Sequence, residues 1–64
     1  MTLRKILPTE SLQAVLKFME VEDIVEVPHS MYPHRSTAVM ASAAAGKTFR
    51  IVQVNDSTLV IRLN

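Results

Sequence analysis

Residues 47–63, KTFRIVQVNDSTLVIRL, decide the fold, because they contain two alternating segments joined by a short polar turn. Residues 47–54 and 58–63 are rich in β-branched side chains and alternate in polarity, which is typical of strands. Residues 55–57, NDS, favour a tight turn, since Asn and Asp tolerate positive φ and bond to their own backbone. The sequence therefore predicts a C-terminal β-hairpin.

The alternation also assigns a face of the sheet to each residue of this hairpin. In the second strand we expect one set of side chains to face the core: Leu59, Ile61 and Leu63. We expect the other set to face outward: Thr58, Val60 and Arg62. In the first strand Arg50 lies on the face opposite Phe49 and Ile51. Pairing through the turn would then bring Arg50 and Arg62 together on one outward face.

Two segments with helical periodicity precede the hairpin. Residues 9–21, TESLQAVLKFMEV, carry one apolar stripe and begin with Thr9 in the capping position. Phe18 lies off this stripe, where it would either widen the buried face or contact a partner. Residues 36–46, STAVMASAAAG, form the second predicted helix, capped by Ser36 or, alternatively, by Ser30 with Pro33 in the first turn. Gly46 suits the positive φ at which many helices end.

The remaining segments complete an α+β pattern. Residues 23–28, DIVEVP, alternate as a strand that ends at Pro28, with Val25 and Val27 on one face. Residues 2–7 form a short edge strand or an extended arm. The element order is then (β)αβαββ. We predict one α+β domain over residues 1–64, with two helices packed on a small, mainly antiparallel sheet of three or four strands.

Length and composition limit the classes of protein to consider. The chain has 64 residues, no cysteine and an apolar content of 48%, which supplies a core that no disulfide can reinforce. A chain this small often buries surface in an interface, so a monomer and a homo-oligomer are equally compatible with the composition. We find neither an apolar run of the roughly 20 residues that a membrane span needs nor a secretory signal, and we expect a cytoplasmic protein.

Charge is unevenly distributed along the chain. Residues 1–26 contain three Lys or Arg against five Asp or Glu, whereas residues 27–64 contain four Lys or Arg against one Asp. The four cations of the second part are Arg35, Lys47, Arg50 and Arg62. Such a basic set could neutralise a few phosphates of a nucleic acid, or it could be an ordinary solvated surface. Nucleic-acid binding through these four residues is our alternative hypothesis for function.

Residues 41–48, ASAAAGKT, have the spacing of a phosphate-binding P-loop in which Ala41 replaces the first glycine. A P-loop lies between a strand and a following helix, whose N-terminus faces the phosphates. Here the predicted helix precedes Gly46 and a strand follows, so its carbonyl end would face the anion. We therefore interpret this segment as a helix terminus and expect no nucleotide.

The sequence favours no metal, cofactor or catalytic site. His29 and His34 are five residues apart, with Glu26 nearby, but this spacing is not a known metal-binding pattern and no cysteine supports it. Ser30 and Ser36 lie close to these histidines, which is common by chance. We therefore expect a protein that is not an enzyme and that acts by binding.

A protein partner is the interpretation that the sequence favours. The alanines of the second predicted helix allow another element to approach closely, and large apolar side chains adapt to a partner surface. We expect the contact residues to be Phe18, Tyr32, Met40 and Ala41. The protein would then be an adaptor or an inhibitor of a larger protein.

Residues 35–64, RSTAVMASAAAGKTFRIVQVNDSTLVIRLN, resemble the ends of small uncharacterised bacteriophage accessory proteins. The shared features are a small-residue helix, Gly-Lys, an aromatic residue, an Arg-containing strand, a polar turn and a closing strand. This resemblance implies a small host-modulating protein without enzymatic activity. It assigns no role to any single residue.

Overall fold

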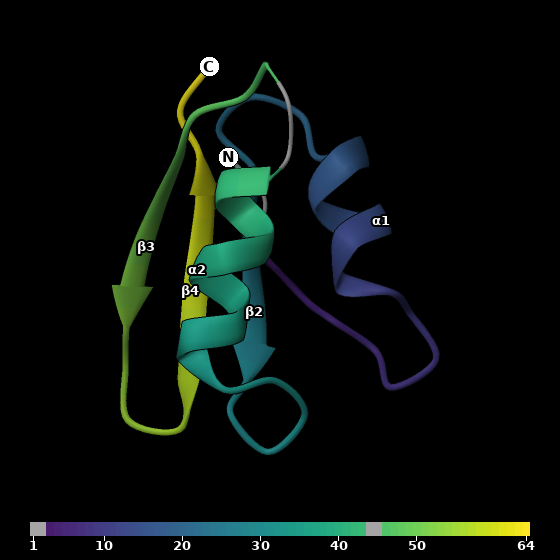
Figure 1. Ribbon diagram of the computed structural model, residues 1–64, viewed down its shortest axis with the longest axis vertical. Helices are drawn as coiled ribbons and strands as arrows, with labels where there is room; N and C mark the ends of the chain where they lie inside the picture. The colour runs from purple at the N-terminus through teal and green to yellow at the C-terminus, as the bar shows by residue number, and fades with distance from the viewer. Residues whose placement is uncertain (1–2, 44–45) are drawn as a thin grey trace.

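The C-terminal hairpin forms half of a four-stranded mixed sheet (Figure 1). A computed structural model describes residues 3–43 and 46–64. Its elements, in chain order, are β1 (Leu3–Lys5), α1 (Leu12–Phe18), β2 (Ile24–Pro28), α2 (His34–Ala43), β3 (Phe49–Gln53) and β4 (Ser57–Arg62). The predicted α+β fold is confirmed, with two helices and the order β-α-β-α-β-β.

The strands lie in the spatial order β1-β2-β4-β3. β1 runs parallel to β2, and the other two pairs are antiparallel. The described part of segment 2–7 is thus a strand of three residues followed by an extended stretch, in which the Ile6 N–H donates to the Glu26 carbonyl at 3.0 Å. The two ends of the sheet are the short strand β1 and the longer strand β3.

Both helices contribute to one core on a single face of the sheet. Among the described residues, the buried apolar side chains come from both helices, the two central strands and the stretches that follow β1 and α1, and they are Ile6, Leu12, Val15, Leu16, Met19, Val25, Val27, Ala41 and Val60. Phe49, Ile51 and Met40 pack against this cluster. The opposite face of the sheet carries the alternate residues of each strand, and no described element covers it.

The expected faces of β4 are wrong. Val60 and Thr58 are completely buried, whereas Leu59 and Ile61 are only partly covered. The pairing with β2 explains this reversal, because Val60 and Thr58 lie directly opposite the buried Val25 and Val27. Both alternating sets of β4 contain apolar residues, so β4 alone could not reveal which set joins the core.

Thr58 fits the core because its hydroxyl has a partner. The His29 Nε2 and Thr58 Oγ1 atoms are 2.8 Å apart. Burial of a hydroxyl without such a bond would be costly. The second fully buried threonine, Thr37 on α2, donates its hydroxyl to the Pro33 carbonyl at 3.4 Å.

The helices begin at other residues than expected. α1 begins at Leu12 and is capped by Ser11, whose Oγ accepts a long bond of 3.5 Å from the Ala14 N–H, so Thr9 is not the cap. α2 begins at His34, immediately after Pro33, which is closer to our alternative start than to a Ser36 cap. Its described part ends at Ala43, and residues 44–45 of the expected helix lie outside the described residues. Gly46 adopts φ 73°, as predicted.

The hairpin turn forms without the positive φ that we expected of it. The Val54 N–H donates to the Ser57 carbonyl at 2.9 Å, so the loop between them is Asn55 and Asp56. Among the described residues, Glu22 is the one non-glycine residue at positive φ. The His29 N–H holds the turn by donating to the Asp56 carbonyl at 2.9 Å.

Candidate functional site

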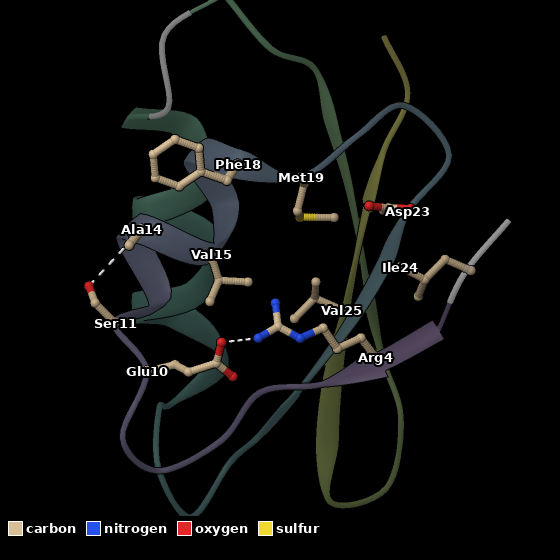
Figure 2. Close-up of a pocket in the computed structure, with 10 residues that line it drawn as sticks. All are labelled: Arg4, Glu10, Ser11, Ala14, Val15, Phe18, Met19, Asp23, Ile24 and Val25. Atoms are coloured by element: carbon tan, nitrogen blue, oxygen red, sulfur yellow. Dashed lines mark hydrogen bonds and ion pairs between the residues drawn. The ribbon is translucent and has the colours of Figure 1, made fainter.

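A groove of about 340 Å³ lies between α1 and the strands β1 and β2 (Figure 2). Its lining comprises Arg4, Glu10, Ser11, Ala14, Val15, Phe18, Met19, Asp23, Ile24 and Val25. Val15 and Met19 point from the helix side toward Val25 of β2, and these three side chains form an apolar floor. We call this feature the α1 groove.

Charged side chains border the α1 groove. The Arg4 guanidinium reaches from β1 toward α1 and forms an ion pair with the Glu10 carboxylate (Figure 2). The second Glu10 oxygen accepts the Leu7 N–H at 2.9 Å, which fixes the loop before α1. Asp23 lies farther along the groove, where its carboxylate accepts the Glu20 N–H at 3.1 Å. The groove therefore combines an apolar floor with polar groups that are already positioned by hydrogen bonds.

Phe18 is the most exposed large apolar side chain among the described residues, at 76%. It stands at the last position of α1 and lines the α1 groove. The Lys17 ammonium lies 5.7 Å from the centre of its ring, which is within the range of a cation–π contact. Nearby Val21 is exposed as well. An aromatic ring without apolar cover at a groove is a typical element of a binding surface.

The other expected partner contacts are less accessible. Tyr32 and Met40 are half-buried and pack against the core. Ala41 is 3% exposed and belongs to the core, so little of its side chain is accessible to a partner. Its lack of a large side chain instead lets α2 approach the sheet closely. Of the four expected residues, Phe18 is the one that is open.

Two of the four expected phosphate-binding cations support α1. The Lys47 ammonium donates to the Leu16 carbonyl at 3.3 Å, and the Arg62 guanidinium donates to the Met19 carbonyl. These carbonyls belong to the C-terminal turn of α1 and the residue after it, where cations also suit the helix dipole. Desolvation, and then the charges of Arg62 and Lys17, lower the pKa of Lys47.

The register of the hairpin separates Arg50 from Arg62. Arg62 pairs with Phe49 on the helix-covered face, whereas Arg50 pairs with Ile61 on the uncovered face. The expectation that both arginines share an outward face is therefore wrong. This error followed from the incorrect assignment of the two faces of β4, which placed Arg62 on the outward face. Arg35 lies in the first turn of α2, so the structure distributes the four cations over several surfaces.

The two histidines take part in packing. His29 bonds to Thr58, and its ring lies 5.7 Å from that of His34. The Glu26 carboxylate accepts the Ser57 hydroxyl at 3.2 Å. Over residues 3–43 and 46–64, no group of three or more His, Cys, Asp and Glu side chains is placed to hold a metal ion.

A second groove, of about 260 Å³, runs between α2 and β3. Ala38, Ala41, Ser42, Thr48, Phe49 and Ile51 line it, and Lys47 stands at the end where β3 begins. We call it the α2 groove. It lies along the free edge of the sheet, whereas the α1 groove lies at the side of β1.

Comparisons with protein-family models, curated proteins and solved structures return no match for this chain. Within the described residues, no helix combines the length and apolar character needed to cross a membrane.

Sequence reasoning identified Phe18 but missed the rest of the α1 groove. Arg4 and Glu10 are six positions apart and join β1 to the loop before α1, and an ion pair between them has no local signature. Val25 reaches the same groove from β2. The off-stripe position of Phe18 was the available signal, but it was equally compatible with a wider buried face, and its exposure in the structure decides between the two.

Proposed function

We propose that this protein is a small, non-enzymatic protein-interaction module, an adaptor or an inhibitor, that binds its partner through the α1 groove. The observation that carries the proposal is the 76% exposure of Phe18 beside an apolar floor. Aromatic residues dominate the energetics of protein interfaces when a partner covers them. Complete burial of such a side chain stabilises a complex by about 1.5–3 kcal/mol.

The composition of the α1 groove indicates the chemistry of the partner surface. Val15, Met19 and Val25 are core residues that are 8%, 4% and 2% exposed, so an apolar side chain of the partner would touch only their outer atoms. Phe18 would supply most of the apolar contact. The Arg4–Glu10 pair and Asp23 suit polar groups around that side chain, since their positions are already held by hydrogen bonds. A preorganised polar rim around an apolar centre is the usual anatomy of a specific interface.

Affinity capture from a lysate of the encoding organism tests this proposal. Wild-type protein should retain one partner in near-stoichiometric amount, and Phe18→Asp should lose it because a carboxylate would replace the apolar anchor. Val39→Asp is the matched control, since Val39 is also an exposed apolar residue of a helix, at 62%, and lies outside both grooves. Equal retention by Phe18→Asp and wild type would refute the proposal.

Nucleic-acid binding stays an untested alternative. The distribution of its four cations over several surfaces, with Lys47 and Arg62 bonded to carbonyls of the α1 end, gives it less support than the groove gives a protein partner. The phage-type role and the cytoplasmic location expected from the sequence also stay predictions.

A further inference from the structure

The outer edge of β3 is an open strand edge. β3 is the last strand in the order β1-β2-β4-β3, and no segment within residues 3–43 and 46–64 pairs with its outer side. Natural proteins usually protect such an edge with proline, a bulge or an inward-pointing charge. The β3 residues, FRIVQ, contain no proline, and their charged residue Arg50 lies on the uncovered face.

The pairing with β4 shows which backbone groups are free. The Val54 N–H donates to Ser57, and the Leu63 N–H donates to the Thr48 carbonyl at 2.7 Å. Bonding residues alternate along an antiparallel strand, so Arg50 and Val52 also direct their backbone groups at β4. Phe49, Ile51 and Gln53 therefore direct their N–H and carbonyl groups away from the sheet, where an added strand would bond.

The two faces beside this edge differ in chemistry. On the helix side an added strand would lie along the α2 groove, whose alanines and Phe49 and Ile51 suit small apolar side chains. On the uncovered side it would lie beside Arg50. Because successive side chains of a strand point to opposite faces, every second residue of the added strand would meet each environment.

The charge of the residues around β3 indicates which kind of added strand would bind there. Residues 27–55, which include all of α2 and β3, contain Arg35, Lys47 and Arg50 and no Asp or Glu. Lys47 stands at one end of the α2 groove. An acidic strand would meet Arg50 on the uncovered face without an opposing carboxylate from α2 or β3, while Lys47 keeps its bond to the Leu16 carbonyl. Such complementarity accelerates and orients binding.

We propose that the β3 edge binds an extended acidic segment of another protein by strand addition. Apolar side chains of the segment enter the α2 groove, and alternate acidic side chains lie beside Arg50. Main-chain bonds to Phe49, Ile51 and Gln53 supply affinity that does not depend on side chains. This site is separate from the α1 groove, and together the two would let the chain connect two proteins.

A second copy of the chain fits this edge less well. In a two-fold antiparallel pairing centred on Ile51, Arg50 of each copy would lie diagonal to its counterpart on the same face. Diagonal neighbours are about 7–8 Å apart, within reach of long side chains, so the two guanidinium charges would repel each other.

Titration with synthetic peptides tests the proposal. The probe is an alternating Val-Glu peptide of about ten residues, the upper length of a typical strand. An alternating Val-Lys peptide of the same length is its control. We expect the Val-Glu peptide to bind at least about tenfold tighter than the Val-Lys peptide. Amide exchange should slow at Phe49, Ile51 and Gln53 in the complex, because their N–H groups become bonded.

Matched variants test whether the charge of Arg50, and not the stability of the fold, determines peptide binding. Arg50→Glu should weaken binding of the Val-Glu peptide about tenfold, whereas Lys5→Glu should not, since Lys5 lies on the same face at the opposite side of the sheet. Phe18→Asp should bind the peptide like wild type, which distinguishes this site from the α1 groove. A Val-Glu peptide methylated on the nitrogens that bond to β3 should bind weakly, because it lacks the donors.

Four results would overturn the proposal. The first is undetectable binding, or equal binding of the two peptides. The second is exchange protection at residues other than those of β3. The third is sedimentation as a dimer whose contacts protect Phe49, Ile51 and Gln53, which would assign the edge to a second copy. The fourth is a single-stranded oligonucleotide that binds these residues more tightly than the Val-Glu peptide does.

Discussion

Thr58 illustrates how single residues determine the packing of this molecule. Its hydroxyl lies in the core because His29 reaches it from the loop after β2. The same loop holds the hairpin turn through the His29 N–H. One histidine therefore joins the end of β2 to both β4 and the turn before it, which explains why a polar residue occupies a fully buried position.

Replacement of Thr58 should be destabilising despite the similar shape of valine. Thr58→Val leaves the His29 ring nitrogen without its partner, and we expect a loss of about 1 kcal/mol in the free energy of unfolding. Thr48→Val is the control, because Thr48 is exposed, and it should change stability by less than about 0.5 kcal/mol. Urea denaturation measures both. A Thr58→Val protein as stable as wild type would show that the bond contributes nothing.

Lys47 should leave a signature in the alkaline pH range. Its pKa is lowered in the folded protein, while the unfolded chain keeps the ordinary lysine value of about 10.4. Between the two values the unfolded state binds more protons, so this group makes stability rise with pH. Lys47→Met should lack that rise. The difference between the two unfolding curves, measured from neutral pH to pH ~10.4, should grow in favour of wild type, and a constant difference would contradict the shift.

At the scale of elements, α1 depends on residues far from it in sequence. The helix has seven residues, and a helix this short is unstable alone in water. Lys47 and Arg62 bind the carbonyls of Leu16 and Met19 at its end, and the Arg4–Glu10 pair holds the loop before it. The position of Phe18 at the α1 groove is therefore set by β1, β4 and the segment before β3.

Loss of the Arg62 contact should loosen α1. Arg62→Met keeps much of the apolar stem but removes the donor to the Met19 carbonyl, and we expect a cost of about 1 kcal/mol. Amide exchange within Leu12–Phe18 should accelerate more than exchange in β2. Arg50→Met is the control, because Arg50 is exposed on the uncovered face. Equal acceleration by both variants would contradict the role of Arg62.

Elements were easier to predict than their ends and faces. The periodicity of residues 9–21 and 36–46 and the alternation of 23–28 and 47–63 were sufficient for the fold class. The start of α1 was not predictable, because Thr9 and Ser11 are both good caps and the Arg4–Glu10 pair draws Glu10 out of the first turn. The faces of β4 depended on its register with β2, which local sequence does not encode.

At the scale of the molecule, the two grooves and the β3 edge all depend on one hydrophobic core. Within the described residues, the buried apolar side chains come from both helices, β2, β4 and the stretches that follow β1 and α1. A chain of this size has little stability to lose, because small domains bury a modest fraction of their surface. The grooves and the β3 edge therefore persist only while this single cluster is intact.

Truncation of the core should unfold the protein as a unit. Leu16 is fully buried, and Leu16→Ala should cost about 2–5 kcal/mol. That loss is a large part of the roughly 3–10 kcal/mol expected for a domain of this length. Far-UV and aromatic signals should be lost together on heating. Separate transitions of the helices and the sheet would show that the core is not one cooperative unit.

The central claim, that a partner protein covers the α1 groove, is tested most directly by amide hydrogen exchange on the complex with the captured partner. We predict slower exchange in α1 and the turn after it, residues 12–23, in wild-type complex relative to free protein. The Val39→Asp complex should show the same pattern. Protection confined to other residues, with exchange around Phe18 unchanged by the partner, would contradict the account.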